Sequence, residues 1–133
     1  MTTGIKAVIY DMDGLIIDSE PLWKIAEIES FQEIGFDFTV EMCALTTGMR
    51  IDQVVHYWWK QLKWDKCSQE DVVYAIEDKM VKLIISKGEI LPGVLNSLKL
   101  LSSLNIPIAL ASSSSMKLIN TTLETLKIKD YFK

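Results

Sequence analysis

The sequence has few of the residues that build disulfide frameworks, and it lacks long apolar runs. It contains two cysteines, Cys43 and Cys67, which stand far apart with no Cys-x-x-Cys spacing. This favours reduced thiols in a cytoplasmic protein over a disulfide or a metal-binding pair. His56 is the only histidine, and we interpret it as a structural residue within a helix. The short apolar run near the N-terminus is soon interrupted by acids, and no later run reaches membrane-spanning length, so neither a secretory signal nor a membrane partner is expected.

Basic residues are also in the minority. The 14 Lys and Arg residues are outnumbered by 18 Asp and Glu residues, which gives a formal net charge of −4. Without a basic stripe, nucleic acid is not expected as a partner. The chain of 133 residues is 49% hydrophobic and 24% charged, so it can bury a real core.

Apolar periodicity predicts two buried strands separated by helices. The predicted strands are 5–10 and 107–111, and the predicted helices cover about 20–34, 51–62, 68–87, 94–103 and 115–127. Between 16 and 88 no strand pattern occurs, so this segment is predicted to be an all-helical insertion. The order predicts an α/β fold with a parallel sheet, formed by 1–15 and 89–133, whose ligands lie at the carboxyl ends of the strands.

Two acids follow the first predicted strand directly. Asp11 and Asp13 are separated by one residue, so strand geometry allows both carboxylates to face the same point. Like charges held together favour a cation or a proton between them, and Mg²⁺ prefers such oxygen ligands. A polar turn at the strand end is the alternative, and the spacing alone leaves both open. A calcium loop is excluded because Gly14 comes too early and Leu22 occupies the position of the bidentate Glu.

The second predicted strand ends in a run of serines, Ser112 to Ser115. Hydroxyl and backbone N–H groups at a strand-to-helix turn can bind an anion, although a flexible loop or a helix cap would use the same residues. Carboxylates suited to a metal at one strand end and anion donors at the other together indicate phosphoryl transfer with an aspartate nucleophile.

The segment DMDGLIIDSEP resembles the first motif of the haloacid dehalogenase-like (HAD) superfamily, and ALASSS is similar to its second motif. The segments TTGMRIDQVVHYWW and ILPGV occur in family order between them. Within the superfamily, the likeness is greatest to bacterial 2-deoxyglucose-6-phosphatases. The resemblance implies a Rossmann-like core with an inserted helical cap over 16–88. It also implies Mg²⁺-dependent hydrolysis of small sugar phosphates such as 2-deoxyglucose 6-phosphate.

The resemblance also implies roles for individual residues at the two strand ends. Asp11 would be the nucleophile, and Asp13 the general acid and then the general base. The Asp11 carboxylate and the Asp13 carbonyl oxygen would hold Mg²⁺. The Met12 N–H, the Ser112 hydroxyl and the Ser113 N–H would bind the phosphate oxygens.

Four further residues are candidates for contact with the substrate. Arg50 has a planar guanidinium group that suits a phosphate or a sugar diol, although it could also be an ordinary surface residue at a helix start. Glu20 would either face the cleft or simply begin a helix. Trp23 could line the pocket or belong to a helical core. Lys117 could meet the substrate or remain a solvated helix residue.

The sequence departs from the family pattern after the second motif. A lysine from a third motif and an acidic pair from a fourth are expected after the last helix, but the sequence given stops at Lys133. We therefore expect this chain alone to bind Mg²⁺ and phosphate weakly and to turn over slowly or not at all. An open sheet edge would also favour self-association or domain swapping.

A phosphomutase related to β-phosphoglucomutase is an alternative to the phosphatase, but it is weakened because Trp23 stands where that branch has a histidine. A non-catalytic phosphate-binding or interaction module is another.

Overall fold

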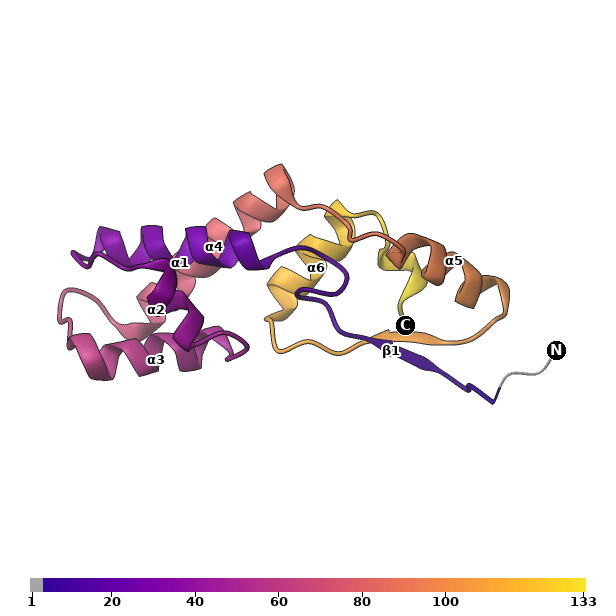
Figure 1. The fold of residues 1–133 in the computed structure, drawn as a ribbon, viewed down its shortest axis with the longest axis horizontal. Helices are drawn as coiled ribbons and strands as arrows, with labels where there is room; N and C mark the ends of the chain where they lie inside the picture. Colours follow the sequence, from indigo (N-terminus) through magenta and orange to yellow (C-terminus); the bar gives the residue numbers. More distant parts are fainter. Residues whose placement is uncertain (1–3) are drawn as a thin grey trace. The chain divides into compact units, whose positions relative to one another are not determined.

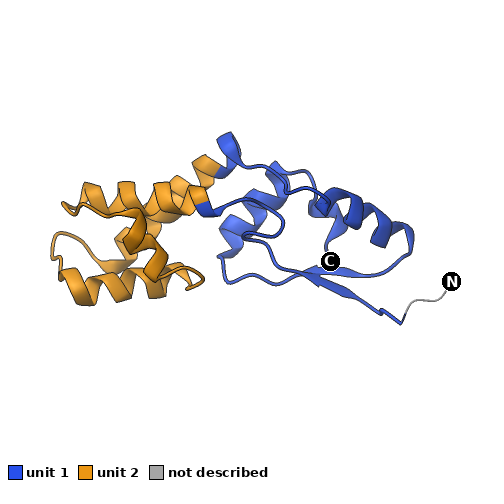
Figure 2. Cartoon of the chain, in the orientation of Figure 1, with its two compact units in different colours: residues 1–20, 84–133 blue, residues 21–83 orange. Residues whose placement is uncertain are grey.

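The computed structural model describes residues 4–133, which divide into two compact units. Unit 1 comprises residues 1–20 and 84–133, and unit 2 comprises residues 21–83 (Figure 2). The predicted helical insertion, 16–88, extends beyond unit 2 at both ends. The residues at those ends belong to unit 1 because the segment before α1 pairs with the segment after α4. Leu91 N–H donates to Ile16 O at 2.8 Å, and Ile17 and Ile90 form an antiparallel bridge.

Unit 1 is a small parallel α/β structure (Figure 1). Within residues 4–133 its sheet consists of two strands, β1 (Val8–Tyr10) and β2 (Ile108–Leu110), which pair in parallel with Val8 opposite Ile108. The connection between them includes α5 (Val94–Ser103), and β2 is followed by α6 (Met116–Thr125) and a short 3-10 helix, η1 (Lys129–Tyr131). The predicted fold class, a parallel α/β core with an all-helical insertion, is confirmed.

The core of unit 1 lies between one face of the sheet and its helices. Its buried residues are Tyr10, Ile16, Val94, Leu98, Ile108, Leu123 and Ile128. The Tyr10 ring packs edge-on against Phe132 with centroids 5.9 Å apart, and its hydroxyl forms a 2.6 Å hydrogen bond with Ser97 Oγ. This tie fixes the last residue of β1 against α5, and it therefore fixes the point at which Asp11 leaves the sheet.

Helices make up unit 2. They are α1 (Glu20–Glu33), α2 (Val40–Leu45), α3 (Ile51–Leu62) and α4 (Gln69–Lys87), of which α1 begins and α4 ends within unit 1. Aromatic side chains form much of the core: Phe31 stacks on Phe38 at 4.3 Å, and Trp64 and Trp58 meet these rings edge-on. Among residues 4–133, none of the helices combines the length and the apolar character needed to cross a membrane.

Several predicted elements differ from the structure in their extent. The strands are shorter than 5–10 and 107–111, and they are not buried on both faces, since the Ile9 side chain is 68% exposed. Helix α2 was not predicted, because its six residues are too few to display a helical period. Instead Thr39 defines its start, since Thr39 Oγ1 accepts the Met42 N–H at 3.1 Å.

Candidate active site

Asp11 and Asp13 lie on the turn that follows β1. Asp11 is exposed, and its Oδ1 accepts a hydrogen bond from the Met12 N–H at 2.8 Å. Met12 is buried, and its carbonyl oxygen accepts the N–H groups of Leu15 and Ile16 at 3.2 and 2.9 Å. Gly14 has a φ of 78°, which L-residues rarely adopt, so glycine allows this tight exit from the sheet. The turn therefore exposes the Asp11 carboxylate to solvent, while the next residue, Met12, is buried and hydrogen-bonded.

The Asp13 carboxylate receives a hydroxyl hydrogen bond on each oxygen. Ser19 Oγ donates to Oδ1 at 2.6 Å, and Ser114 Oγ donates to Oδ2 at 2.8 Å. Ser114 follows β2, so this bond joins segments 101 positions apart. The parallel register explains the meeting, because both chains leave the same edge of the sheet. The structure thus brings the two strand ends together, with Asp13 and the serine run in direct contact.

The four serines after β2 differ in their contacts and in their exposure. Ser112 is half-buried, and its Oγ accepts the Ser114 N–H at 3.1 Å. Ser113 is exposed. Ser115 is the N-cap of α6, and its Oγ accepts the Leu118 N–H at 3.4 Å. The first turn of α6 therefore opens directly beside the predicted phosphate-binding serines.

Of the remaining predicted substrate residues, Glu20 and Lys117 belong to unit 1, and Trp23 and Arg50 belong to unit 2. Glu20 is exposed at the first position of α1, and Lys117 is exposed in the first turn of α6. Trp23 is half-buried in α1 within unit 2. Arg50, also in unit 2, precedes α3 and forms an exposed bidentate pair with Asp52 at 3.1 and 3.2 Å. This hydrogen bond to Arg50 lowers the pKa of the Asp52 carboxyl group.

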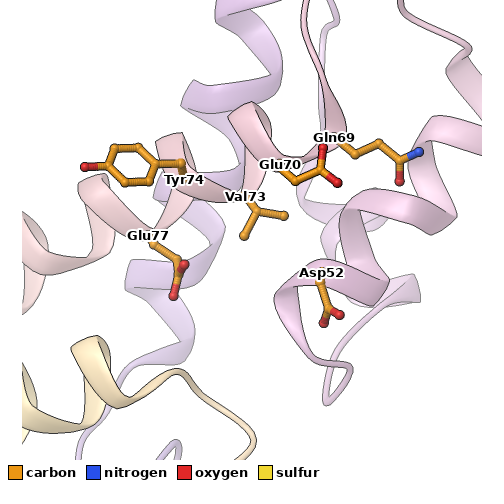
Figure 3. Close-up of a pocket in the computed structure, with 6 residues that line it drawn as sticks. All are labelled: Asp52, Gln69, Glu70, Val73, Tyr74 and Glu77. Atoms are coloured by element: carbon orange, nitrogen blue, oxygen red, sulfur yellow. The ribbon is translucent and has the colours of Figure 1, made fainter.

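A pocket of unit 2 lies between α3 and α4 and has a volume of about 370 Å³ (Figure 3). Its lining residues are Asp52, Gln69, Glu70, Val73, Tyr74 and Glu77. Three of these carry carboxylates, which repel phosphate. The pocket is therefore a poor site for a phosphorylated substrate, in contrast to the donor-rich strand ends of unit 1.

Asp11 and Asp13 offer oxygen ligands of the kind that Mg²⁺ prefers. Mg²⁺ is usually bound by one or two carboxylates and retains several waters, and the exposed Asp11 carboxylate fits this chemistry. A cluster of three or more His, Cys, Asp or Glu side chains suited to a metal does not occur within residues 4–133. The residues present therefore match part of the oxygen ligand set that Mg²⁺ prefers.

The sequence analysis missed Ser19 and Ser114 as site residues. Ser19 is completely buried although it sits in the polar segment Asp18-Ser19-Glu20, and Ser114 is one of four serines that look alike. A signal was present in the register, since Ser114 lies four residues beyond β2 and Asp13 three beyond β1. Only the folded loops show which hydroxyl points to Asp13.

Comparisons with known proteins agree with this architecture. The family model of the haloacid dehalogenase-like hydrolases matches residues 8–133. Hexitol phosphatase B of Escherichia coli K12 is 34% identical over 129 residues, which cover 96% of this chain and 58% of that protein. The chain thus spans less than two thirds of this relative.

Solved structures show the same fold. β-Phosphoglucomutase from Clostridium difficile has a TM-score of 0.78 at 26% identity, covering 97% of this chain and 60% of that one. CbbY from Rhodobacter sphaeroides, solved in complex with phosphate, has a TM-score of 0.82 at 22% identity, covering 96% and 61%. The two carboxylates after β1, the serine run after β2 and the family match together place this chain among the haloacid dehalogenase-like hydrolases.

Proposed function

We propose that this chain belongs to a Mg²⁺-dependent phosphatase that hydrolyses small sugar phosphates through an aspartyl-phosphate intermediate. The observation that carries the proposal is the meeting of two strand ends, where the exposed Asp11 lies two residues from Asp13 and Asp13 is bonded to Ser114. The similarity to hexitol phosphatase B supports a phosphorylated sugar or sugar alcohol as the substrate.

In the proposed reaction, an Asp11 carboxylate oxygen attacks phosphorus and the bond from phosphorus to the substrate oxygen breaks. Asp13 gives a proton to the departing alkoxide. Water then attacks the phosphoryl group, Asp13 takes a proton from that water, and the bond between Asp11 and phosphorus breaks to release phosphate.

The phosphoryl oxygens would be held by donors at the strand ends. These are the Ser112 hydroxyl, the Ser113 N–H and the Met12 N–H, with the N-terminus of α6 adding a favourable dipole. Asp11 and the Asp13 carbonyl oxygen would hold Mg²⁺, which would neutralise charge on the transferring group. The rest of the substrate would be contacted by Glu20, Trp23, Arg50 and Lys117.

The free thiols of Cys43 and Cys67 agree with action in the cytoplasm.

A panel of sugar and sugar-alcohol phosphates tests the proposal. The protein expressed from its complete reading frame is assayed with Mg²⁺ for phosphate release, with Asp11→Asn as the matched variant that retains the shape of the side chain. We expect release by the wild type alone and a phosphoryl group trapped on Asp11 after rapid acid quench. Equal rates for wild type and Asp11→Asn would refute the proposal.

A phosphomutase is a second candidate, favoured by the structural likeness to β-phosphoglucomutase. The products separate the two: a phosphatase yields free phosphate, whereas a mutase yields an isomeric sugar phosphate and needs a bisphosphate primer. Phosphate binding without either product would instead indicate a non-catalytic module.

The edge of the sheet supports a further proposal, that the chain self-associates or exchanges segments with a second copy. Val8 N–H donates to Pro107 O and Tyr10 O accepts from Ala111 N–H, so both residues bond toward β2. Alternation in a strand then directs the Ile9 backbone toward the opposite edge. An apolar, exposed strand edge favours pairing with another chain.

A further inference from the structure

The two hydroxyl groups that donate to Asp13 belong to serines whose own backbone N–H groups are hydrogen-bonded within unit 1. Ser19 is 0% exposed, and its N–H donates to Ile17 O at 2.9 Å. Ser114 is half-buried, and its N–H donates to Ser112 Oγ at 3.1 Å. Each serine is therefore fixed through its own backbone before its side chain reaches Asp13. The contacts with Oδ1 and Oδ2, at 2.6 and 2.8 Å, hold the carboxylate from two sides.

We propose that Ser19 and Ser114 are positioning residues that fix the orientation of the Asp13 carboxyl group for proton transfer. This inference rests on the proposed function of Asp13 as general acid and base. The serines act through Asp13 and need not touch the phosphoryl group.

Fixing the carboxyl group matters because proton transfer depends on geometry. When Asp13 gives its proton to the leaving oxygen, negative charge appears on its carboxylate, and the two hydroxyl groups already point at that charge. Donors that are oriented before charge develops stabilise it without reorganisation. When the carboxylate later takes a proton from water, the same two contacts hold it in the same orientation.

Ser114→Ala in the protein expressed from its complete reading frame is the primary test. Loss of a hydrogen-bond partner that orients a metal ligand typically costs about 10- to 100-fold in affinity or activity. By analogy we expect kcat for a sugar phosphate to fall by about 10- to 100-fold, with KM changed less than about two-fold. Ser114→Thr keeps a hydroxyl and should restore most of kcat. Ser19→Ala should repeat the kcat loss. An unchanged kcat in Ser114→Ala would overturn the positioning role while the phosphatase function stands.

A double-mutant cycle separates action through Asp13 from direct contact with the substrate. In the Asp13→Asn background no proton can be carried at this position, so Ser114→Ala should change the residual turnover by less than about two-fold. A full loss that persists in that background would assign Ser114 to the substrate and overturn the inference.

Ser115→Ala is the matched control from the same serine run. Ser115 is the N-cap of α6, and its hydroxyl oxygen accepts the Leu118 N–H at 3.4 Å. We expect Ser115→Ala to lower the urea midpoint with kcat retained. Ser114→Ala should instead lower kcat with the urea midpoint retained.

The side-chain carboxyl ¹³C signal of Asp13 provides a readout that does not depend on turnover. We expect this signal to shift in Ser114→Ala and in Ser19→Ala, but not in Ser115→Ala. If the wild type has no turnover, the proposed function fails, and the ¹³C signal alone then tests whether Ser19 and Ser114 contact Asp13. An Asp13 signal unchanged by Ser114→Ala would overturn the inference whether or not the protein is active.

Discussion

Glu27 on α1 is a buried carboxyl group that should make the stability of unit 2 depend on pH. Its side chain is 8% exposed, and Oε1 lacks a hydrogen-bond partner among residues 4–133. Burial raises the pKa of Glu27 from 4.5 to about 7. Burial likewise raises the pKa of the Cys43 thiol to about 11, and the charge of Glu27 contributes to that shift. Cys43 therefore does not titrate near neutral pH.

The sign follows from the protons bound in each state. Below pH 4.5 Glu27 is protonated in both the folded and the unfolded chain, so burial carries no charge penalty. Between 4.5 and about 7 the unfolded chain loses the proton and the folded chain keeps it, so the free energy of unfolding falls as pH rises. One pKa unit corresponds to about 1.4 kcal/mol, so this shift lowers stability by about 3 kcal/mol by the time the pH exceeds 7.

Glu27→Gln removes the titration while it keeps the size of the side chain. Urea unfolding of wild type and variant is followed by tryptophan fluorescence at pH values from about 5 to about 8. All four tryptophans, at positions 23, 58, 59 and 64, lie in unit 2, so the signal reports that unit. We expect the variant to gain stability relative to the wild type by about 2 to 3 kcal/mol across this range.

Glu29→Gln is the matched control, since Glu29 lies on the same helix and is exposed. Comparing the variants at each pH cancels the titration of groups that they share. If the free energies of wild type and Glu27→Gln run parallel from pH 5 to 8, burial does not keep Glu27 protonated and the reasoning is wrong.

Three further predictions concern other parts of the chain. Thr39→Ala should lower the stability of unit 2 by about 1 kcal/mol in the same unfolding assay, because it removes the N-cap of α2, and Thr39→Asn should retain it. Ile9→Lys should reduce self-association in sedimentation velocity without shifting the tryptophan-detected transition, and a wild type that is already monomeric would contradict the edge argument. Arg50→Lys should lower kcat/KM for a sugar phosphate by about 10-fold with an unchanged unfolding midpoint, since lysine cannot form the bidentate contact; equal kcat/KM would remove Arg50 from the substrate site.

Helical periodicity was a reliable guide where a helix is long and has one buried side. The pattern of Val54, Val55 and Trp58 predicts α3 with the bounds that the structure has, because these residues bury one face. Helix α4 was also predicted, but along it Val72 is buried whereas its neighbour Val73 is only half-buried. Apolar residues next to each other along a helix leave the choice of face to tertiary packing.

The chemistry of the strand ends could be predicted only as far as residue type and chain position. Both strands were recognised by their apolar runs, and parallel strands must end at the same edge of the sheet. That argument predicts that Asp13 and the serine run approach each other, but it cannot choose among four serines. The choice depends on the turn after β1, where the Met12 carbonyl oxygen and Gly14 set the direction of the chain.

The register of the sheet connects the core of unit 1 to its chemistry. Tyr10 lies opposite Leu110, and each is the last residue of its strand, so the two segments that carry Asp13 and Ser114 leave the sheet side by side. A slip of one residue would turn Tyr10 away from Ser97 and move Asp13 by about 3.3 Å relative to Ser114. The 2.8 Å hydrogen bond would not survive that displacement. The buried contacts of β1 therefore do more than stabilise the fold, because the same register that packs Tyr10 also brings the Ser114 hydroxyl group to Asp13 Oδ2.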